Sequence, residues 1–177
     1  FCNGNESCDA DGLCAAGASP CDPTQSCDED ADLCASSSFS VDIKPGVCPM
    51  MMVTSARGYL PVAIVGDVAS VDVRTVRLGR ADGVGTAVQP VSSPNGQAPR
   101  LTDVSGPGEA CTCPDRGSDG SDELVGSFRR EEVVHSLQLD KLGRRVTVEL
   151  AVSGTLLDGT PFSASDCVTI QTTGNPT

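Results

Sequence analysis

The spacing of six cysteines at the start of the chain constrains its fold more than any other feature. They are separated by five, five, six, five and six residues, with Asp, Gly, Asn and Pro between them, and so form an internal repeat. The segment has too few large apolar residues to bury a core, so disulfides that restrict the unfolded chain are the expected source of order. We expect three local disulfides, and fifteen pairings remain open. The six are Cys2, Cys8, Cys14, Cys21, Cys27 and Cys34.

Ten cysteines beside one histidine and no tryptophan are typical of a protein that folds in an oxidising compartment. We therefore expect a secreted, extracellular protein at the cell surface. No signal peptide opens the sequence, so Phe1 is expected to follow a processing site or an artificial boundary. The net charge of -12 argues against nucleic acid or an anionic membrane as a partner and favours divalent cations. The sequence has no apolar run of about 20 residues, so we expect no membrane span.

The negative charge is concentrated in the first 40 residues, which carry eight acids and no Lys or Arg. That segment alone is -8, whereas the other sixteen acids and all twelve bases give the rest of the chain -4. This change in composition predicts a boundary near Ser36 to Ser40. We expect an acidic cysteine-rich arm with little regular structure at residues 1–38, a β-sandwich domain at residues 39–172 and a C-terminal tail at residues 173–177.

From Phe39 onward, β-branched runs separated by turn residues predict strands. Every second residue from Val146 to Val152 is apolar, which predicts that four side chains, including Val146, face a core. Asp158-Gly159 predicts a hairpin turn, and apolar spacing within Glu131–Leu139 predicts one short helix. The body is expected to be an antiparallel β-sandwich, jelly-roll or immunoglobulin-like, with that helix. The expected strands are Val41–Ile43, Leu60–Val65, Thr75–Leu78, Val146–Val152 and Cys167–Gln171.

Three ordered motifs make residues 41–171 resemble a domain of secreted bacterial proteins known by its DIKPG opening. Members commonly continue with an acidic, glycine-containing loop before an apolar strand, and Asp119–Leu124 stands where that loop belongs. The sequence departs from the family at Met50–Met52, which replaces the usual asparagines. The resemblance implies a fold and a compartment more than an activity. The motifs are Asp42–Gly46, Gly58–Ile64 and Leu156–Phe162.

The first segment resembles the FCNG-type cysteine repeats of large secreted bacterial proteins. Phe1–Gly4 and Glu6–Cys8 carry this resemblance. Asn5 opens an N-glycosylation sequon and is a candidate glycosylation site.

Four carboxylates fall within nine residues, interrupted by two glycines, in a stretch too polar to be a strand. Closely spaced carboxylates on a glycine-bent loop can converge on a hard cation such as calcium, which takes about six to eight oxygen ligands. We expect Asp103 to close this site from the preceding strand, and the resemblance also favours a metal. A solvated acidic loop is the alternative. The expected ligands are Asp103, Asp115, Asp119, Asp122 and Glu123. A second candidate calcium site is formed by Asp28, Asp30 and Asp32.

Four further cysteines, Cys48, Cys111, Cys113 and Cys167, belong to the body. We expect two disulfides that clip the opening turn and the acidic loop onto the sandwich. A tetrahedral zinc site is the alternative, although such sites usually use a C-x2-C spacing.

The only histidine, His135, lies on the predicted helix, and no nucleophile elbow or free cysteine accompanies it. We therefore expect no enzyme activity. The charge contrast between the arm and the body favours a structural or adhesive module, and we expect it to be the repeating subunit of a surface filament. Copies of the chain would then associate head-to-tail through the arm. The alternative is a module of a larger secreted multidomain protein that binds polysaccharide or a surface.

Overall fold

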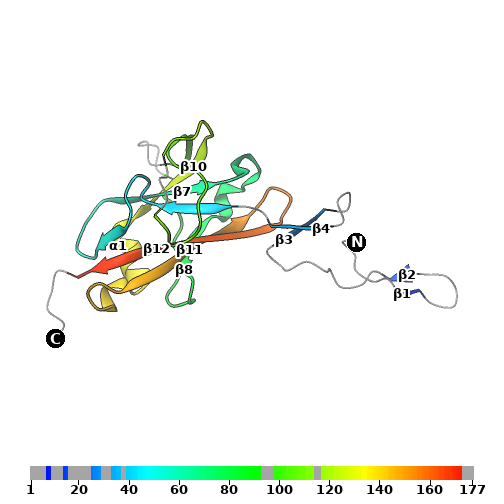
Figure 1. The fold of residues 1–177 in the computed structure, drawn as a ribbon. Helices are drawn as coiled ribbons and strands as arrows, with labels where there is room; N and C mark the ends of the chain where they lie inside the picture. Colours follow the sequence, from blue (N-terminus) through cyan, green and yellow to red (C-terminus); the bar gives the residue numbers. More distant parts are fainter. Residues whose placement is uncertain are drawn as a thin grey trace. The chain divides into compact units, whose positions relative to one another are not determined.

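The computed structural model describes residues 39–92, 98–113 and 117–172 in full, together with the backbone of four short strands in the first 38 residues (Figure 1). The chain divides into two compact units, Phe1–Ser38 and Phe39–Thr177. Among the described residues, no helix is long and apolar enough to cross a membrane.

The first unit contains two antiparallel strand pairs. Strand β1 (Ser7–Cys8) pairs with β2 (Cys14–Ala15), and β3 (Gln25–Asp28) pairs with β4 (Leu33–Ser36). The registers place Cys8 opposite Cys14 and Cys27 opposite Cys34. The disulfide pairing of this unit stays a prediction. Cys2, Cys21, Asn5, Asp30, Asp32 and the side chain of Asp28 lie outside the described residues.

The second unit is a sandwich of two four-stranded sheets with one α-helix, which confirms the expected fold class (Figure 1). The first sheet has the order β5 (Ser40–Ile43), β7 (Tyr59–Val65), β10 (Glu123–Arg129), β9 (Arg100–Thr102), with all pairs antiparallel. The second has the order β6 (Met50–Val53), β12 (Pro161–Gln171), β11 (Thr147–Thr155), β8 (Arg77–Arg80).

One pair in the second sheet departs from the antiparallel expectation, because β6 runs parallel to β12. The chain leaves the first sheet after β5, passes through a turn and continues as β6 at the edge of the second sheet. With β5 and β6 taken as two halves of a first strand A, the orders become A-B-E-D and A′-G-F-C. This is the strand order of the immunoglobulin-type sandwich, and it decides between the two architectures expected.

The core lies between the two sheets. Val148, Leu150 and Val152 of β11 are buried as expected, but Val146 is 39% exposed, because it precedes the strand. The predicted strand at Thr75 begins later, at Arg77, because the 3-10 helix η2 (Val73–Thr75) occupies the preceding residues. A second such turn, η1 (Val68–Ser70), comes before it.

Strand β6 was not expected from the sequence, whereas β9 and β10 correspond to the strand expected before Asp103 and the apolar strand implied after the acidic loop, neither of which was given bounds. Every residue of β10 except Arg129 is buried, so its burial does not follow the alternation on which strand prediction depends. The predicted helix is present as α1 (Arg130–Ser136), with Val133 and Val134 buried. It ends earlier than expected, since Gln138 has a left-handed backbone (φ 54°) and the chain continues as the 3-10 helix η3 (Leu139–Lys141).

Candidate metal centre

Three of the five expected metal ligands meet at one end of the first sheet. Asp103 follows β9, Glu123 opens β10, and Asp119 lies in the loop between these strands. Thr102 pairs with Glu123 across the two strands, so the residues on either side of that pair are held together. One carboxylate oxygen from each of Asp103, Asp119 and Glu123 lies within 4.8 Å of the others.

The other two expected ligands do not join this group. Asp122 is exposed and stands outside it, although it directly precedes Glu123. Adjacent residues of an extended strand point to opposite sides, so Asp122 and Glu123 cannot both face the same point. Asp115 lies outside the described residues.

Glu123 is the buried member of the group, with an exposed fraction of 1%. Its Oε2 accepts hydrogen bonds from the backbone N–H groups of Val104 (2.7 Å) and Ser105 (2.9 Å). Its Oε1 is buried and has no hydrogen-bond partner among the described residues. A buried carboxylate oxygen without a donor is costly and calls for a specific explanation. A bound cation supplies one.

The loop between β9 and β10 is folded around the carboxylate of Asp103. Asp103 accepts hydrogen bonds from the backbone N–H groups of Asp119 (3.1 Å) and Gly120 (3.0 Å). Gly120 has φ +93°, a conformation that glycine adopts readily. The Oδ1 of Asp119 accepts from the N–H of Ser121 at 2.9 Å, which fixes the orientation of that side chain. The bent loop therefore brings Asp119 back toward the first sheet.

The carboxylate of Asp119 and one further oxygen, the carbonyl of Gly117, approach the strand-to-loop segment at Gly106. A Cβ atom placed on Gly106 would stand 3.4 Å from Oδ2 of Asp119 and 3.7 Å from the carbonyl oxygen of Gly117. The group is made of oxygen donors alone, which suits a hard cation such as Ca²⁺ better than zinc. With three carboxylates in so small a space, a divalent cation would remove a like-charge repulsion.

Residues 103–113, which we call the strap, cover the outer face of the first sheet. Val41 and Ile43 of β5 point into the core, so Asp42 points to the opposite face, yet it is only 6% exposed. Ser105 of the strap donates a hydrogen bond from its Oγ to Asp42 (2.7 Å), and the N–H of Gly108 donates to Oγ of Ser40 (3.3 Å). These contacts account for the burial of Asp42 and Glu123 on the outer face.

Two disulfides attach the far end of the strap. Cys111 is bonded to Cys167 of β12, and Cys113 is bonded to Cys48 between β5 and β6. The expectation of two disulfides in the body is confirmed, and the zinc alternative is wrong for these four residues because their sulfur atoms are bonded to one another. The strap is thus held at the candidate metal centre at one end and at the second sheet at the other.

Asp166 was missed by sequence reasoning. It is 8% exposed, and its carboxylate accepts hydrogen bonds from the backbone N–H groups of Ile43 (3.1 Å), Cys111 (3.3 Å) and Cys167 (2.8 Å). It therefore joins β5, the strap and β12. A signal was present in the sequence: Asp166 has the same strand parity as Val168 and Ile170, so a charged residue occupies a core-facing position.

His135 is a surface residue on α1. Its side chain is 76% exposed and lies 3.4 Å from Asp140. It lies on the helix, as the sequence predicted.

A scan of protein-family models and a search of curated proteins both find no match to this chain.

Proposed function

We propose that this chain is an extracellular structural or adhesive module whose sandwich is stabilised by calcium, bound by Asp103, Asp119 and Glu123. The observation that carries the proposal is the buried Oε1 of Glu123, which has no donor among the described residues, in a side chain whose carboxylate lies beside two others. Acidic clusters on protein surfaces are common without a metal, but a buried carboxylate oxygen without a partner is not.

The two oxygens of Glu123 divide between the strap and the cation in this proposal. Oε2 holds the strap through the N–H groups of Val104 and Ser105. Oε1 binds Ca²⁺ together with Asp103 and Asp119. Calcium therefore stabilises the start of the strap, which lies over the first sheet. The two disulfides stabilise the end of the strap.

The extracellular location rests on the disulfides. All four body cysteines are paired, in bonds that close long segments of chain. Disulfides of this kind persist in oxidising compartments. Outside cells, calcium sites of extracellular modules work with dissociation constants of about 10⁻⁴ to 10⁻³ M, a range that a small carboxylate site can reach.

Thermal unfolding of the full chain with and without calcium tests the proposal. A ligand that binds only the folded state at ten times its Kd adds about 1.4 kcal/mol of stability. For a domain of this size, that corresponds to a rise in Tm of about 3 to 6 °C. The comparison uses EDTA, CaCl₂ and MgCl₂ at matched ionic strength. Equal melting temperatures in EDTA and in millimolar calcium, with no binding heat by calorimetry, would remove the metal from the proposal.

A further inference from the structure

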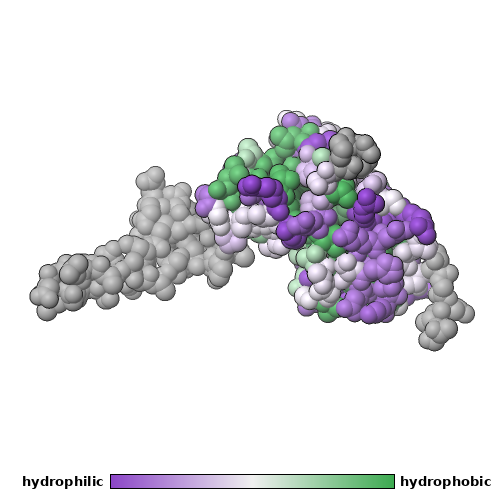
Figure 2. All heavy atoms as spheres, turned by 180° about the vertical axis from the view of Figure 1, so that it is seen from behind, coloured by the Kyte–Doolittle hydropathy of each residue, from purple (hydrophilic) through white to green (hydrophobic). Residues whose placement is uncertain are grey.

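The described body is unevenly charged along its length, with bases, all but Arg130 exposed, gathered at the end opposite the candidate metal centre. The loop between β6 and β7, the end of β10 and the connection from α1 to β11 supply them. Figure 2 shows, on one face of the body, that hydrophilic and apolar side chains are segregated on the surface. We call this group the basic end: Arg57, Arg129, Arg130, Lys141, Arg144 and Arg145.

Backbone hydrogen bonds hold these three segments side by side. The N–H of Arg130 donates to the carbonyl oxygen of Gly58 at 2.9 Å. The N–H of Arg145 donates to the carbonyl oxygen of Ile170, and the N–H of Thr54 donates to that of Gln171, so both segments flank the end of β12. The bases are thus brought to one end by the topology, although they are far apart in the sequence.

Most of this positive charge has no acidic partner within the described body. Arg57 pairs with Glu131 at 2.7 Å, and the guanidinium of Arg129 lies 5.8 Å from the centre of the Tyr59 ring. No ion pair formed among the described residues includes Arg129, Arg130, Arg144 or Arg145. Glu132, on α1, is a further acid nearby. An exposed basic cluster in a chain of net charge -12 offers a surface for an acidic partner.

A groove adjoins the basic end. It has a volume of about 410 Å³ and is lined by Leu142, Val146 and Glu149 among others. Val146 is 39% exposed there, so the groove has an apolar wall that a partner segment can cover. Arg144 and Arg145, both exposed, lie between Leu142 and Val146 in the chain.

The described body begins at the end opposite the basic end, where β5 starts. Ser40, the first residue of β5, pairs with Val65, and Glu123 lies beside the same end of β7. Strand β10 runs from Glu123 to Arg129, so the candidate metal centre and the basic end are about 20 Å apart along the sheet. The first 38 residues carry eight acids and no base, and they directly precede Phe39 and Ser40 in the chain.

We propose that the basic end binds the acidic segment 1–38 of a second copy of this chain, in a head-to-tail contact. A segment that leaves one end of a body and binds the other end of the next body gives a heterologous contact, which forms filaments when the rotation does not close. The inference rests on the proposed structural function. The two proposals can fail separately, because calcium binding is tested by thermal unfolding and the head-to-tail contact by measuring association between chains.

Zero-length cross-linking reads out the contact directly. The chain has only two lysines, Lys44 and Lys141, and Lys141 belongs to the basic end. A carbodiimide couples a lysine amine to a carboxylate in direct contact with it. In an equal mixture of ¹⁴N- and ¹⁵N-labelled full chains, we expect peptides that join Lys141 of one label to acids of residues 1–38 of the other label. Cross-links of Lys141 confined to single-label peptides would overturn the proposal.

Sedimentation of charge-reversed full chains provides the second test. The Arg144→Glu/Arg145→Glu variant should weaken association at least about tenfold, because it replaces two attractive positive charges by two negative charges that repel the segment. The control, Lys44→Glu/Arg100→Glu, makes the same change in net charge on other elements and should associate like wild type. Association of wild type should also fall between about 0.05 and 0.5 M salt, where screening grows. A monomer under all conditions, or equal weakening by both variants, would contradict the contact. Unchanged melting temperatures verify that each variant folds.

Discussion

The carboxylate of Asp166 on β12 accepts a hydrogen bond from the backbone N–H of Ile43 on β5 at 3.1 Å, so a side chain of one sheet satisfies the open edge of the other. Ile43 is fully buried at this junction, and an unpaired N–H there would be costly. The same carboxylate also accepts from Cys111 of the strap. One buried acid therefore connects three parts of the body that no backbone ladder joins.

Replacing this acid tests its structural role. The Asp166→Asn variant puts an amide NH₂ toward at least one backbone donor, so we expect a loss of about 2 to 3 kcal/mol in the free energy of unfolding. Guanidinium unfolding in oxidising, calcium-containing buffer measures it. Glu132→Gln, an exposed acid on α1, is the matched control and should change stability by less than about 0.5 kcal/mol. Equal unfolding midpoints for Asp166→Asn and Glu132→Gln would contradict the structural role of Asp166.

Glu123→Gln separates metal binding from structure. In EDTA, the variant should melt at or above the wild-type temperature, because a neutral amide beside Asp103 and Asp119 relieves repulsion between carboxylates. In calcium, it should lose the rise in Tm, with affinity at least about tenfold weaker by calorimetry, since the site has lost one charge.

Asp122→Asn is the control for this experiment. It changes the neighbouring acid, which is exposed and outside the converging group, and should keep the wild-type calcium response. A loss of response in Asp122→Asn together with a normal response in Glu123→Gln would place the cation elsewhere.

The disulfide between Cys111 and Cys167 should affect calcium binding as well as stability. Closing a segment of 56 residues contributes about 4 kcal/mol in the chain-entropy description, so the Cys111→Ala/Cys167→Ala variant should be destabilised by up to that amount. Because the strap then loses its attachment to β12, we also expect a weaker calcium affinity.

Cys48→Ala/Cys113→Ala removes the other bond and serves as the comparison. It should lose similar stability, since its segment of 65 residues is of similar length, but the strap stays attached through Cys111. Denaturant unfolding and calcium calorimetry on both variants decide the matter. An equal calcium affinity in the two would show that the attachment at Cys167 does not reach the metal centre.

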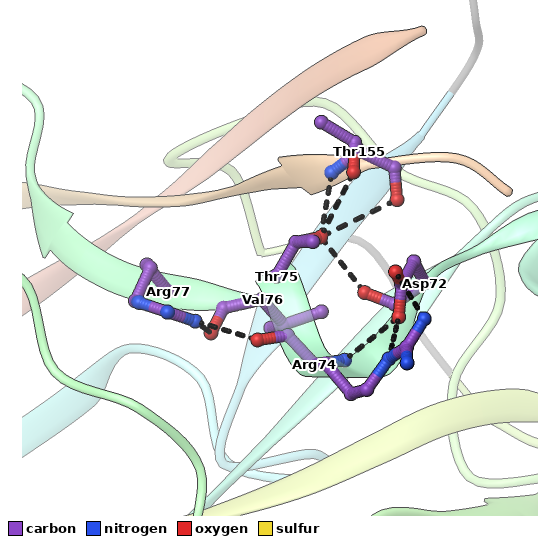
Figure 3. A network of polar contacts seen from close by, with 6 residues as sticks. All are labelled: Asp72, Arg74, Thr75, Val76, Arg77 and Thr155. Carbon is purple, nitrogen blue, oxygen red and sulfur yellow. Dashed lines mark hydrogen bonds and ion pairs between the residues drawn. The ribbon is translucent and has the colours of Figure 1, made fainter. Parts of the chain in front are cut away.

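Asp72 gives the protein a stability that depends on acidity. Its carboxylate accepts two hydrogen bonds from the Arg74 guanidinium, at 2.9 and 3.0 Å, and these lower its pKa below the usual value (Figure 3). A lowered folded-state pKa means that the contribution is present above the unfolded pKa, about 3.9, and is lost as the pH falls through the folded value. The Asp72→Asn variant should therefore be less stable than wild type at pH 7, and the two should converge as the pH falls through the lowered folded-state pKa.

Unfolding midpoints across pH 2 to 7 measure this convergence. Thr75 shares the turn, and its hydroxyl accepts from the N–H of Thr155 on β11 and donates to the carbonyl of Asp72 (Figure 3). Thr75→Val removes that contact but no titrating group. The stability that this variant loses relative to wild type should therefore stay constant with pH. If the loss of stability in Asp72→Asn were also constant with pH, the Asp72 carboxylate would be excluded as the source of the pH dependence.

Local patterns in the sequence were sufficient for the sandwich class, the helix and the terminal hairpin. β11 alternates between apolar and polar residues, and Asp158-Gly159 forms the turn before β12, so both elements are visible to arguments that use neighbouring residues alone. The body cysteines could also be assigned to disulfides by composition and spacing. The same local view gave no bounds for β10, because that strand is buried on both faces and shows no alternation.

The candidate metal centre shows the same division. Asp103 and Asp119 could be named from the sequence because acidic residues cluster there, but Asp122 appeared equivalent to Glu123. Only the pairing of β9 with β10 turns Glu123 inward and Asp122 outward, since neighbouring residues of a strand face opposite sides. Likewise, the choice of Cys167 for Cys111 and the three hydrogen bonds of Asp166 depend on β5 and β12 lying side by side. Contacts between residues distant in the chain are decided by the packing of the two sheets, which no local pattern encodes.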